Sequence, residues 1–136
     1  MLDSDVVYLV GHAHIDLCWL WIRNETIHDI CPRTFMSVLR LMRKFPFFTF
    51  SQSSAQIYEW MERYYPEIFE EIKRNVKDGR WEIVGGSWTE HNATIPCGES
   101  LIRQYLFGKR YFMKKFGIDV EIAWLPDTFG FCWSLP

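Results

Sequence analysis

The stretch that decides the fold is Val6–Asp16, VVYLVGHAHID, an apolar run that passes directly into a cluster of ionisable side chains. Successive side chains of an extended chain point to opposite faces, so His12, His14 and Asp16 share one face. Imidazole nitrogens and carboxylate oxygens are ligands that zinc accepts, and a catalytic zinc site keeps one position open. The pattern therefore predicts a strand that ends in a metal site. The alternative is that the histidines are ordinary strand-end residues, hydrogen-bonded to their neighbours.

Three more short apolar runs follow, and longer stretches with helical spacing separate them. We expect strands at Val6–Gly11, Phe47–Ser51, Trp81–Val84 and Val120–Leu125. Helical spacing predicts helices over Thr34–Met42, Ser54–Tyr64, Pro66–Lys77 and Glu99–Phe116. Strands and helices that alternate in this way are typical of βαβ units. The expected fold class is α/β, with a parallel sheet of repeated βα units.

Polar clusters follow all four predicted strands. They are His12–Asp16, Gln52–Ser54, Gly85–Asn92 and Pro126–Gly130. Chemistry in parallel α/β folds gathers at the carboxyl ends of the strands, so these clusters are expected at one rim of the sheet. Asp127 would then add a second carboxylate to His14 and Asp16. The alternative is that Asp127 caps the turn that follows it.

Aromatic side chains lie close to these clusters in the sequence, among them Trp19, Trp21, Trp88 and Phe129. Their flat apolar faces suit the C–H faces of a pyranose ring. For any single one of them, packing in the core is the alternative. Taken together, the aromatic residues favour a sugar as the substrate.

Composition limits the remaining classes of function. The chain has 136 residues, a hydrophobic content of 49% and a formal net charge of -2, which indicates one globular domain. Its interleaved charges give no reason to expect nucleic acid or a membrane as a partner. The four cysteines are widely spaced and are expected to be reduced thiols. The first apolar run is too short for a signal peptide, so we expect a cytoplasmic location.

Four motifs carry a resemblance to a known family. They are HAHIDLCWLW (12–21), SSAQIYEW (53–60), GESLIRQ (98–104) and WLPDTFGF (124–131). In this order they resemble the class II α-mannosidases of glycoside hydrolase family 38. The resemblance covers the amino-terminal part of the α/β barrel domain of that family, from about residue 6 onward in this chain.

The resemblance implies a zinc-dependent retaining α-mannosidase that acts on an α-mannoside or oligosaccharide. His14 and Asp16 match the first two zinc ligands of the family, and Asp127 matches the aspartate that is both a ligand and the nucleophile. Trp19 matches the aromatic residue that stacks on the sugar. His12 belongs to the first motif, and we expect it to support a metal ligand by hydrogen bonding.

The resemblance also implies that part of the site comes from elsewhere. The general acid of the family and its fourth zinc ligand, a histidine, belong to sequence beyond residue 136. We therefore expect 1–136 to be a single truncated domain with little activity alone. A C-terminal continuation or a second chain would complete it. A homo-oligomer is a separate expectation for the partners of the chain.

Two acids in the chain and two substitutions bear on the chemistry. Glu99 is expected in the first turn of a helix, where a carboxylate complements the helix dipole. Glu90 is expected near the site, although it does not match the acid of the family. Asn92 and Thr94 stand where relatives usually have aspartate and asparagine, which implies altered polar contacts near the substrate.

Two other functions fit the same residues. One is a non-catalytic remnant that binds a sugar or a metal ion. The other is a metal-dependent carbohydrate deacetylase, in which the nucleophile would be a metal-bound water rather than Asp127.

Overall fold

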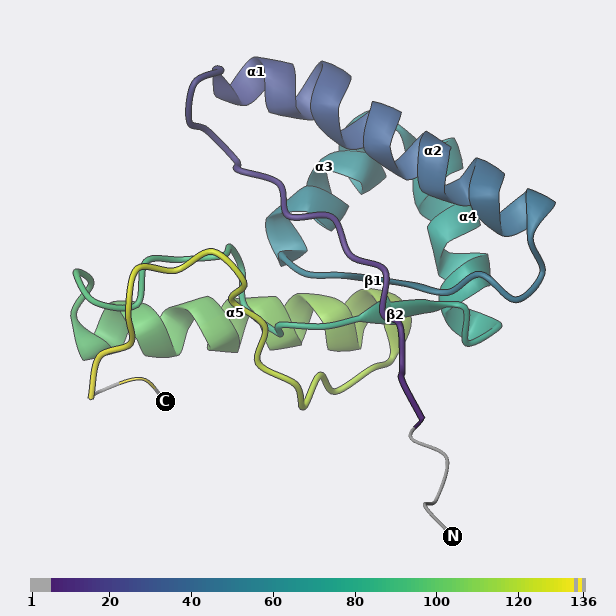
Figure 1. Ribbon diagram of the computed structural model, residues 1–136. Helices are drawn as coiled ribbons and strands as arrows, with labels where there is room; N and C mark the ends of the chain where they lie inside the picture. Colours follow the sequence, from purple (N-terminus) through teal and green to yellow (C-terminus); the bar gives the residue numbers. More distant parts are fainter. Residues whose placement is uncertain (1–5, 134, 136) are drawn as a thin grey trace, which may run out of the picture.

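The computed structural model describes residues 6–133 and 135, so residues 1–5, 134 and 136 of the expected 1–136 domain lie outside the described residues. Figure 1 shows a short sheet with helices packed around it. In chain order the elements are α1 (Arg23–Glu25), the π-helix η1 (Thr26–Ile30), α2 (Cys31–Lys44), β1 (Phe50–Gln52), α3 (Ala55–Tyr64), α4 (Pro66–Lys77), β2 (Trp81–Ile83) and α5 (Gly98–Phe116). The fold is therefore a mixture of helices and a small parallel sheet.

The sheet pairs β1 with β2 in parallel. Phe50 lies opposite Trp81, and Gln52 lies opposite Ile83. The chain passes from β1 to β2 through α3 and α4, which is the helical crossover that parallel strands require. The predicted parallel βα arrangement is therefore confirmed for the middle of the chain.

The two outer strands that the sequence predicts do not form. Val6–Gly11 and Val120–Leu125 have no strand assignment and lie beside the sheet. The Ser51 amide donates to the last carbonyl of the first segment at 2.8 Å, and the Gly85 amide donates to the second segment at 2.8 Å. Leu9 is 88% exposed. A strand needs successive ladder bonds and a covered face, and each segment has only isolated contacts with one neighbour.

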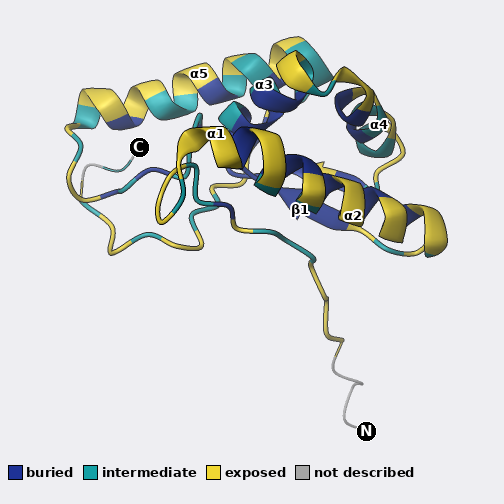
Figure 2. Cartoon of the chain, turned by 90° about the horizontal axis from the view of Figure 1, so that it is seen from above, coloured by how far each residue is buried: buried dark blue, intermediate teal, exposed yellow. Residues whose placement is uncertain are grey.

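The four predicted helices are confirmed, with shifts at their ends. α2 begins at Cys31 and runs to Lys44, beyond both predicted limits. α5 ends at Phe116, because Gly117 adopts a left-handed φ of 72° that closes the helix. Figure 2 shows that α2 and α5 turn their exposed residues outward and their buried residues inward. Within the described part of the chain, no helix is long and apolar enough to cross a membrane.

A short helix and a π-helix precede α2, and the sequence does not predict them. The buried Thr26 hydroxyl accepts a hydrogen bond from Trp21 Nε1 at 3.0 Å and donates one to the Leu17 carbonyl at 2.8 Å. These contacts join the segment to the loop before it. α1 and η1 therefore form where the chain makes these contacts with the preceding loop. Hydrophobic periodicity in the sequence does not indicate such contacts.

A buried aromatic cluster fixes the two strands relative to α3. Trp81 Nε1 donates to the Tyr58 hydroxyl at 2.8 Å, and that hydroxyl donates to the Gln52 carbonyl at 3.0 Å. The Tyr58 ring also meets Phe112 edge to face, and the Trp81 ring meets Phe35 in the same way. These hydrogen bonds and ring contacts fix the position of the end of β1 relative to α3 and β2.

The loop after β2, residues 84–97, is held between α5 and the C-terminal segment. A Cβ atom at Gly108 of α5 would overlap the Gly86 carbonyl and the Trp88 amide, so the helix and the loop touch backbone to backbone. On its other side the loop forms a parallel bridge between Ala93 and Phe131. Its position is therefore set by two elements that follow it in the chain.

Candidate active site

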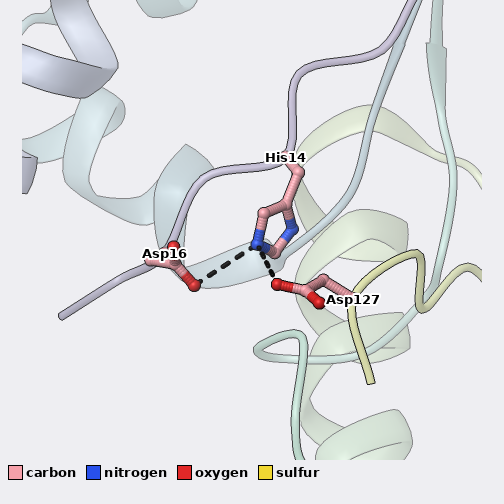
Figure 3. A group of neighbouring side chains, drawn as sticks. All are labelled: His14, Asp16 and Asp127. Atoms are coloured by element: carbon pink, nitrogen blue, oxygen red, sulfur yellow. Dashed lines mark hydrogen bonds and ion pairs between the residues drawn. The ribbon is translucent and has the colours of Figure 1, made fainter. Parts of the chain in front are cut away.

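Three side chains from two distant parts of the chain meet at the carboxyl end of the sheet (Figure 3). His14 Nε2 lies 3.3 Å from Asp16 Oδ1 and 3.3 Å from Asp127 Oδ2. One ligand atom of each residue lies within 4.8 Å of the other two. The structure therefore brings together the three residues that the sequence predicts as metal ligands, and their role as ligands stays a prediction.

The local fold explains this convergence. Ile15 is buried in the core, and its neighbours His14 and Asp16 both reach the site. Asp127 lies in the turn that begins at Pro126, just after the outer segment that contacts the loop of β2. The side chains of His14 and Asp127 are 29% and 53% accessible, so the cluster is open to solvent and to a substrate.

The cluster suits a divalent cation in both chemistry and spacing. Two atoms that bind one zinc ion at about 2.0 to 2.2 Å and at a tetrahedral angle lie about 3.4 Å apart. The two 3.3 Å separations from His14 Nε2 match that spacing. They are also longer than the usual N–H···O hydrogen bond of about 2.7 to 3.2 Å. The residues present therefore fit a zinc ion, with one imidazole and two carboxylates as donors.

Glu90 is the main addition that the structure makes to the site. Its Oε2 atom lies 2.5 Å from His14 Nδ1, and Ser53 Oγ donates to its Oε1 atom at 2.6 Å. The Glu90 amide donates to Ser54 Oγ at 3.1 Å. The sequence places Glu90 near the site but does not indicate these partners. The polar residues that follow β1 and β2 are the feature from which they could have been inferred.

His12 lies next to the Glu90 oxygen that does not contact His14. Its Nδ1 atom lies 3.0 Å from the Ser51 carbonyl, and its Nε2 atom lies 3.8 Å from Glu90 Oε1. The imidazole meets the Trp124 ring at 5.2 Å between centroids. His12 is thus placed next to the partner of His14, and its expected support of a ligand stays a prediction.

The charges of the site act on both partners of this contact. Burial lowers the pKa of His14, but the Glu90 and Asp16 carboxylates outweigh it and hold that pKa above the usual 6.5. Burial raises the pKa of Glu90, but contacts with His12, Ser53 and His14 outweigh it and hold that pKa below its usual value. Glu90 is therefore a carboxylate at neutral pH and adds negative charge beside His14.

Comparison with known proteins decides the family. Residues 5–136 match the model of the N-terminal domain of glycosyl hydrolases family 38. The chain belongs to this family. Membership in family 38 confirms the resemblance drawn from the four motifs, and it favours glycoside hydrolysis over the deacetylase alternative.

Named relatives and a solved structure agree with family 38. The chain is similar to alpha-mannosidase G of Dictyostelium discoideum, with 46% identity over 96% of the chain and 12% of that protein. It is similar to human alpha-mannosidase 2C1, with 39% identity over 98% of the chain and 13% of that protein. A crystal structure of an alpha-mannosidase from Enterococcus faecalis V583 matches with a TM-score of 0.75 and 26% identity, over 88% of this chain and 13% of that one. The chain thus spans about an eighth of these relatives.

The structure also places three residues that the sequence predicts to bear on substrate binding, Trp19, Asn92 and Thr94. Trp19 is 67% exposed and meets Trp21 edge to face at 6.3 Å, so its ring is open to a ligand. Asn92 Oδ1 accepts hydrogen bonds from the Thr94 amide and hydroxyl, both at 2.8 Å, which closes a local turn. Stacking by Trp19, and altered substrate contacts through Asn92 and Thr94, stay predictions.

Proposed function

We propose that this chain forms the part of a zinc-dependent, retaining α-mannosidase that binds the metal ion and supplies the nucleophile. The observation that carries the proposal is the convergence of Asp16 and Asp127 on His14 Nε2, at 3.3 Å each. The relatives named as alpha-mannosidases support the choice of an α-mannoside as the substrate. His14, Asp16 and Asp127 would hold the zinc ion. When bound, zinc would act as a Lewis acid that binds sugar hydroxyls and keeps the carboxylates beside it ionised.

Asp127 is the proposed nucleophile. Its Oδ2 atom faces His14, so we assign Oδ1 to the attack on the anomeric carbon of the sugar. The new ester bond forms as the glycosidic bond breaks, and the leaving oxygen takes a proton from a general acid. Water then attacks the anomeric carbon, the bond from that carbon to Asp127 Oδ1 breaks and frees the carboxylate, and the same acid group, now deprotonated, accepts the proton of the water. The exposed ring of Trp19 would stack on the sugar during both steps.

The general acid requires a further carboxyl group about 5 to 5.5 Å from the nucleophile. Glu90 is engaged by His14 and Ser53, and Asp16 faces His14. We therefore propose that the acid and a fourth ligand come from a C-terminal continuation or a second chain. Residues 1–136 would then be one truncated domain, in which the sheet and its two flanking segments begin a larger (β/α) barrel. A cytoplasmic location also stays a prediction.

Hydrolysis of an aryl α-mannoside, with and without zinc, tests the proposal. We expect little turnover from the chain alone and zinc-dependent turnover once the continuation is present. Asp127→Asn should abolish that turnover, whereas the matched change Asp119→Asn, at an exposed acid paired with Lys109, should retain it. Turnover by the chain alone that Asp127→Asn removes would show that no added sequence is needed. Turnover that survives Asp127→Asn or removal of zinc would overturn the proposed mechanism.

The engagement of Glu90 also favours a second candidate, a domain that binds zinc and a sugar without turnover. Calorimetry with mannose, in the presence and absence of zinc, separates the two functions. Binding by the completed protein without any hydrolysis would favour the second. A covalent sugar adduct on Asp127 would favour the enzyme and would also exclude a deacetylase.

A further inference from the structure

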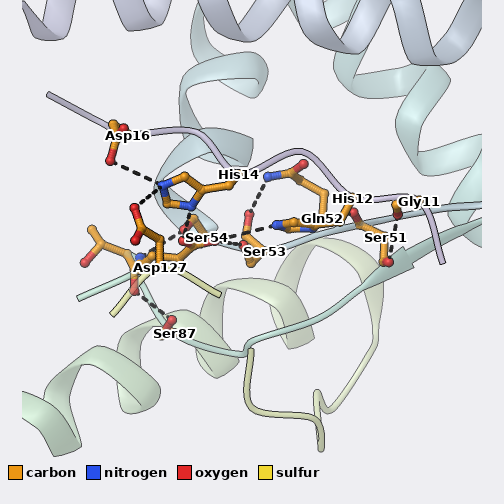
Figure 4. A network of polar contacts seen from close by, with 12 residues as sticks. Gly11, His12, His14, Asp16, Ser51, Gln52, Ser53, Ser54, Ser87 and Asp127 are labelled. Atoms are coloured by element: carbon orange, nitrogen blue, oxygen red, sulfur yellow. Dashed lines mark hydrogen bonds and ion pairs between the residues drawn. The ribbon is translucent and has the colours of Figure 1, made fainter. Parts of the chain in front are cut away.

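The structure assigns Glu90 as the positioning residue of His14: it holds the proton on Nδ1, so that the lone pair of Nε2 faces Asp16 and Asp127. This inference deepens the proposed function, because it concerns the residue that prepares His14 to bind a metal ion. Glu90 acts through His14 and is not assigned to the reaction itself. Figure 4 shows the polar network around His14, in which Ser53 and Ser54 lie close to the imidazole ring.

The distances around the imidazole distinguish its two nitrogens. The Nδ1 atom lies 2.5 Å from Glu90 Oε2, whereas both carboxylate contacts of Nε2 are 3.3 Å long. A neutral imidazole carries one proton, and the shorter contact to a carboxylate is where that proton stabilises the pair most. In the neutral ring Nε2 is then left as the acceptor, and its lone pair faces Asp16 and Asp127, which is the arrangement that a metal ion between the three residues would use.

Glu90 is itself held firmly enough to orient a ring. Its side chain is only 9% accessible, and Ser53 Oγ donates to the oxygen that does not contact His14. The Glu90 backbone is anchored by its amide hydrogen bond to Ser54 Oγ. Ser54 has a left-handed φ of 69°, which is uncommon for a residue other than glycine and places strain next to the site. Glu90, on the loop after β2, is thus tied to the end of β1 and to the segment that carries His14.

Two other roles for Glu90 fit the geometry less well. As a metal ligand it would have to reach the ion at Nε2, but its carboxylate contacts Nδ1, and the two ring nitrogens of an imidazole point in diverging directions. As a general acid it would have to offer a proton to the substrate. Both of its oxygens are instead engaged, by His14 and by Ser53.

The first test reads the tautomer of His14 directly. Nitrogen-15 NMR of the metal-free full chain, at an alkaline pH where imidazole is neutral, should show the His14 proton on Nδ1. Glu90→Ala should move most of that population to Nε2. The control Glu82→Gln removes one negative charge from an exposed position of β2 and should leave the tautomer unchanged. A wild-type proton on Nε2, or an unchanged tautomer in Glu90→Ala, overturns the inference.

The second test measures zinc affinity by competition with a chromophoric chelator. Loss of a carboxylate that orients a metal-binding histidine weakens binding by about 10- to 100-fold. We expect a loss of that size in Glu90→Ala, a smaller loss in Glu90→Gln, which keeps an acceptor for Nδ1–H, and wild-type affinity in Glu82→Gln. If Glu90→Ala fails to fold, Glu90→Gln decides, because its side chain keeps the shape of glutamate. Affinity in Glu90→Gln equal to that of Glu82→Gln overturns the inference.

The two tests separate this inference from the proposed function. An Nδ1 proton that depends on Glu90, found in a completed protein that does not hydrolyse α-mannosides, would support the positioning role and reject the mannosidase. An active, zinc-dependent mannosidase whose His14 tautomer ignores Glu90 would support the enzyme and reject the positioning role.

Discussion

Ser53 is the residue that links β1 to the carboxylate behind His14. It is fully buried, and its hydroxyl donates to Glu90 Oε1 at 2.6 Å. Ser53→Ala removes the hydrogen bond to Glu90 Oε1 and leaves this mostly buried oxygen without the Ser53 donor. We expect the free energy of unfolding to fall by about 1–3 kcal/mol in urea titrations. Ser37→Ala, which removes an exposed hydroxyl from α2, should change it by less than about 0.5 kcal/mol. Equal effects of the two changes would contradict this reading of Ser53.

His91 makes the stability of the protein sensitive to mild acid. Burial lowers its pKa below 6.5, despite the contact of Nδ1 with the Thr89 carbonyl. Among the described residues nothing accepts a hydrogen bond from Nε2, so a second proton there has no acceptor. The unfolded chain therefore takes up a proton at a higher pH than the folded protein does. Stability contributed by neutral His91 is lost as the pH falls below 6.5 and through its folded pKa.

His91→Phe, which keeps a ring against Tyr105, should remove this part of the acid sensitivity. Urea unfolding at a series of pH values below neutrality should show the variant gaining on the wild type as the pH falls. The difference between the two proteins isolates His91, because His14, whose pKa is raised, changes stability in the opposite direction in both. His28→Phe, at an exposed histidine, is the control. Parallel pH profiles for His91→Phe and the wild type would refute the prediction.

At the residue scale the sequence was sufficient to predict which candidate metal-binding side chains lie close together, but not which side chain orients them. The meeting of His14, Asp16 and Asp127 followed from the rule that strand ends share a rim, although regular strands do not form before His14 or Asp127. The contact of Glu90 with His14 did not follow from any pattern. It depends on which nitrogen of one ring faces which side chain, and that is decided by rotamers and by the path of the loop after β2.

The element that places Glu90 is α5, through a glycine. Gly108 packs against the backbone of the loop at Gly86, where a Cβ atom has no room. Gly108→Ala must push helix and loop apart, and we expect it to lower the free energy of unfolding by about 1–3 kcal/mol or more. Gly98→Ala in the same helix has nothing within 4 Å and should change it by less than about 1 kcal/mol. Denaturant unfolding measures both free energies. A Gly108→Ala variant as stable as Gly98→Ala would contradict the prediction, because it would show that helix and loop move apart at little cost.

At the element scale, local patterns predicted helices better than strands. The apolar stripe of α2, with Phe35, Val38 and Leu39 buried, is present in the sequence and needs no partner to be recognised. The run Val6–Gly11 has the composition of a strand, but strand formation also needs successive ladder hydrogen bonds and packing against neighbouring side chains. The run contacts β1 through the Gly11 carbonyl, and its side chains from Val6 to Val10 are exposed. The sequence pattern did not predict the π-helix, because this helix occurs where the buried Thr26 hydroxyl forms hydrogen bonds with the preceding loop.

At the scale of the whole molecule, the site joins the two ends of the described chain. His14 follows the first extended segment, 6–11, and Asp127 lies in the turn just after the last, 120–125. The two segments lie on opposite sides of the sheet, since the first contacts Ser51 of β1 and the second contacts Gly85, two residues after β2. A cation bound by His14 and Asp127 would therefore link the two outer segments across both strands of the sheet.

Zinc should consequently stabilise the whole protein and not only its site. A ligand that binds only the folded state adds about 2.7 kcal/mol when its free concentration is a hundred times its Kd. We expect zinc to raise the unfolding temperature of the wild type and a chelator to reverse the rise. Asp127→Ala should remove most of the response. Asp119→Ala loses an exposed acid that pairs with Lys109 and should respond like the wild type, because surface ion pairs contribute little. A zinc response that survives in Asp127→Ala would mean that the ion does not connect the two ends of the chain.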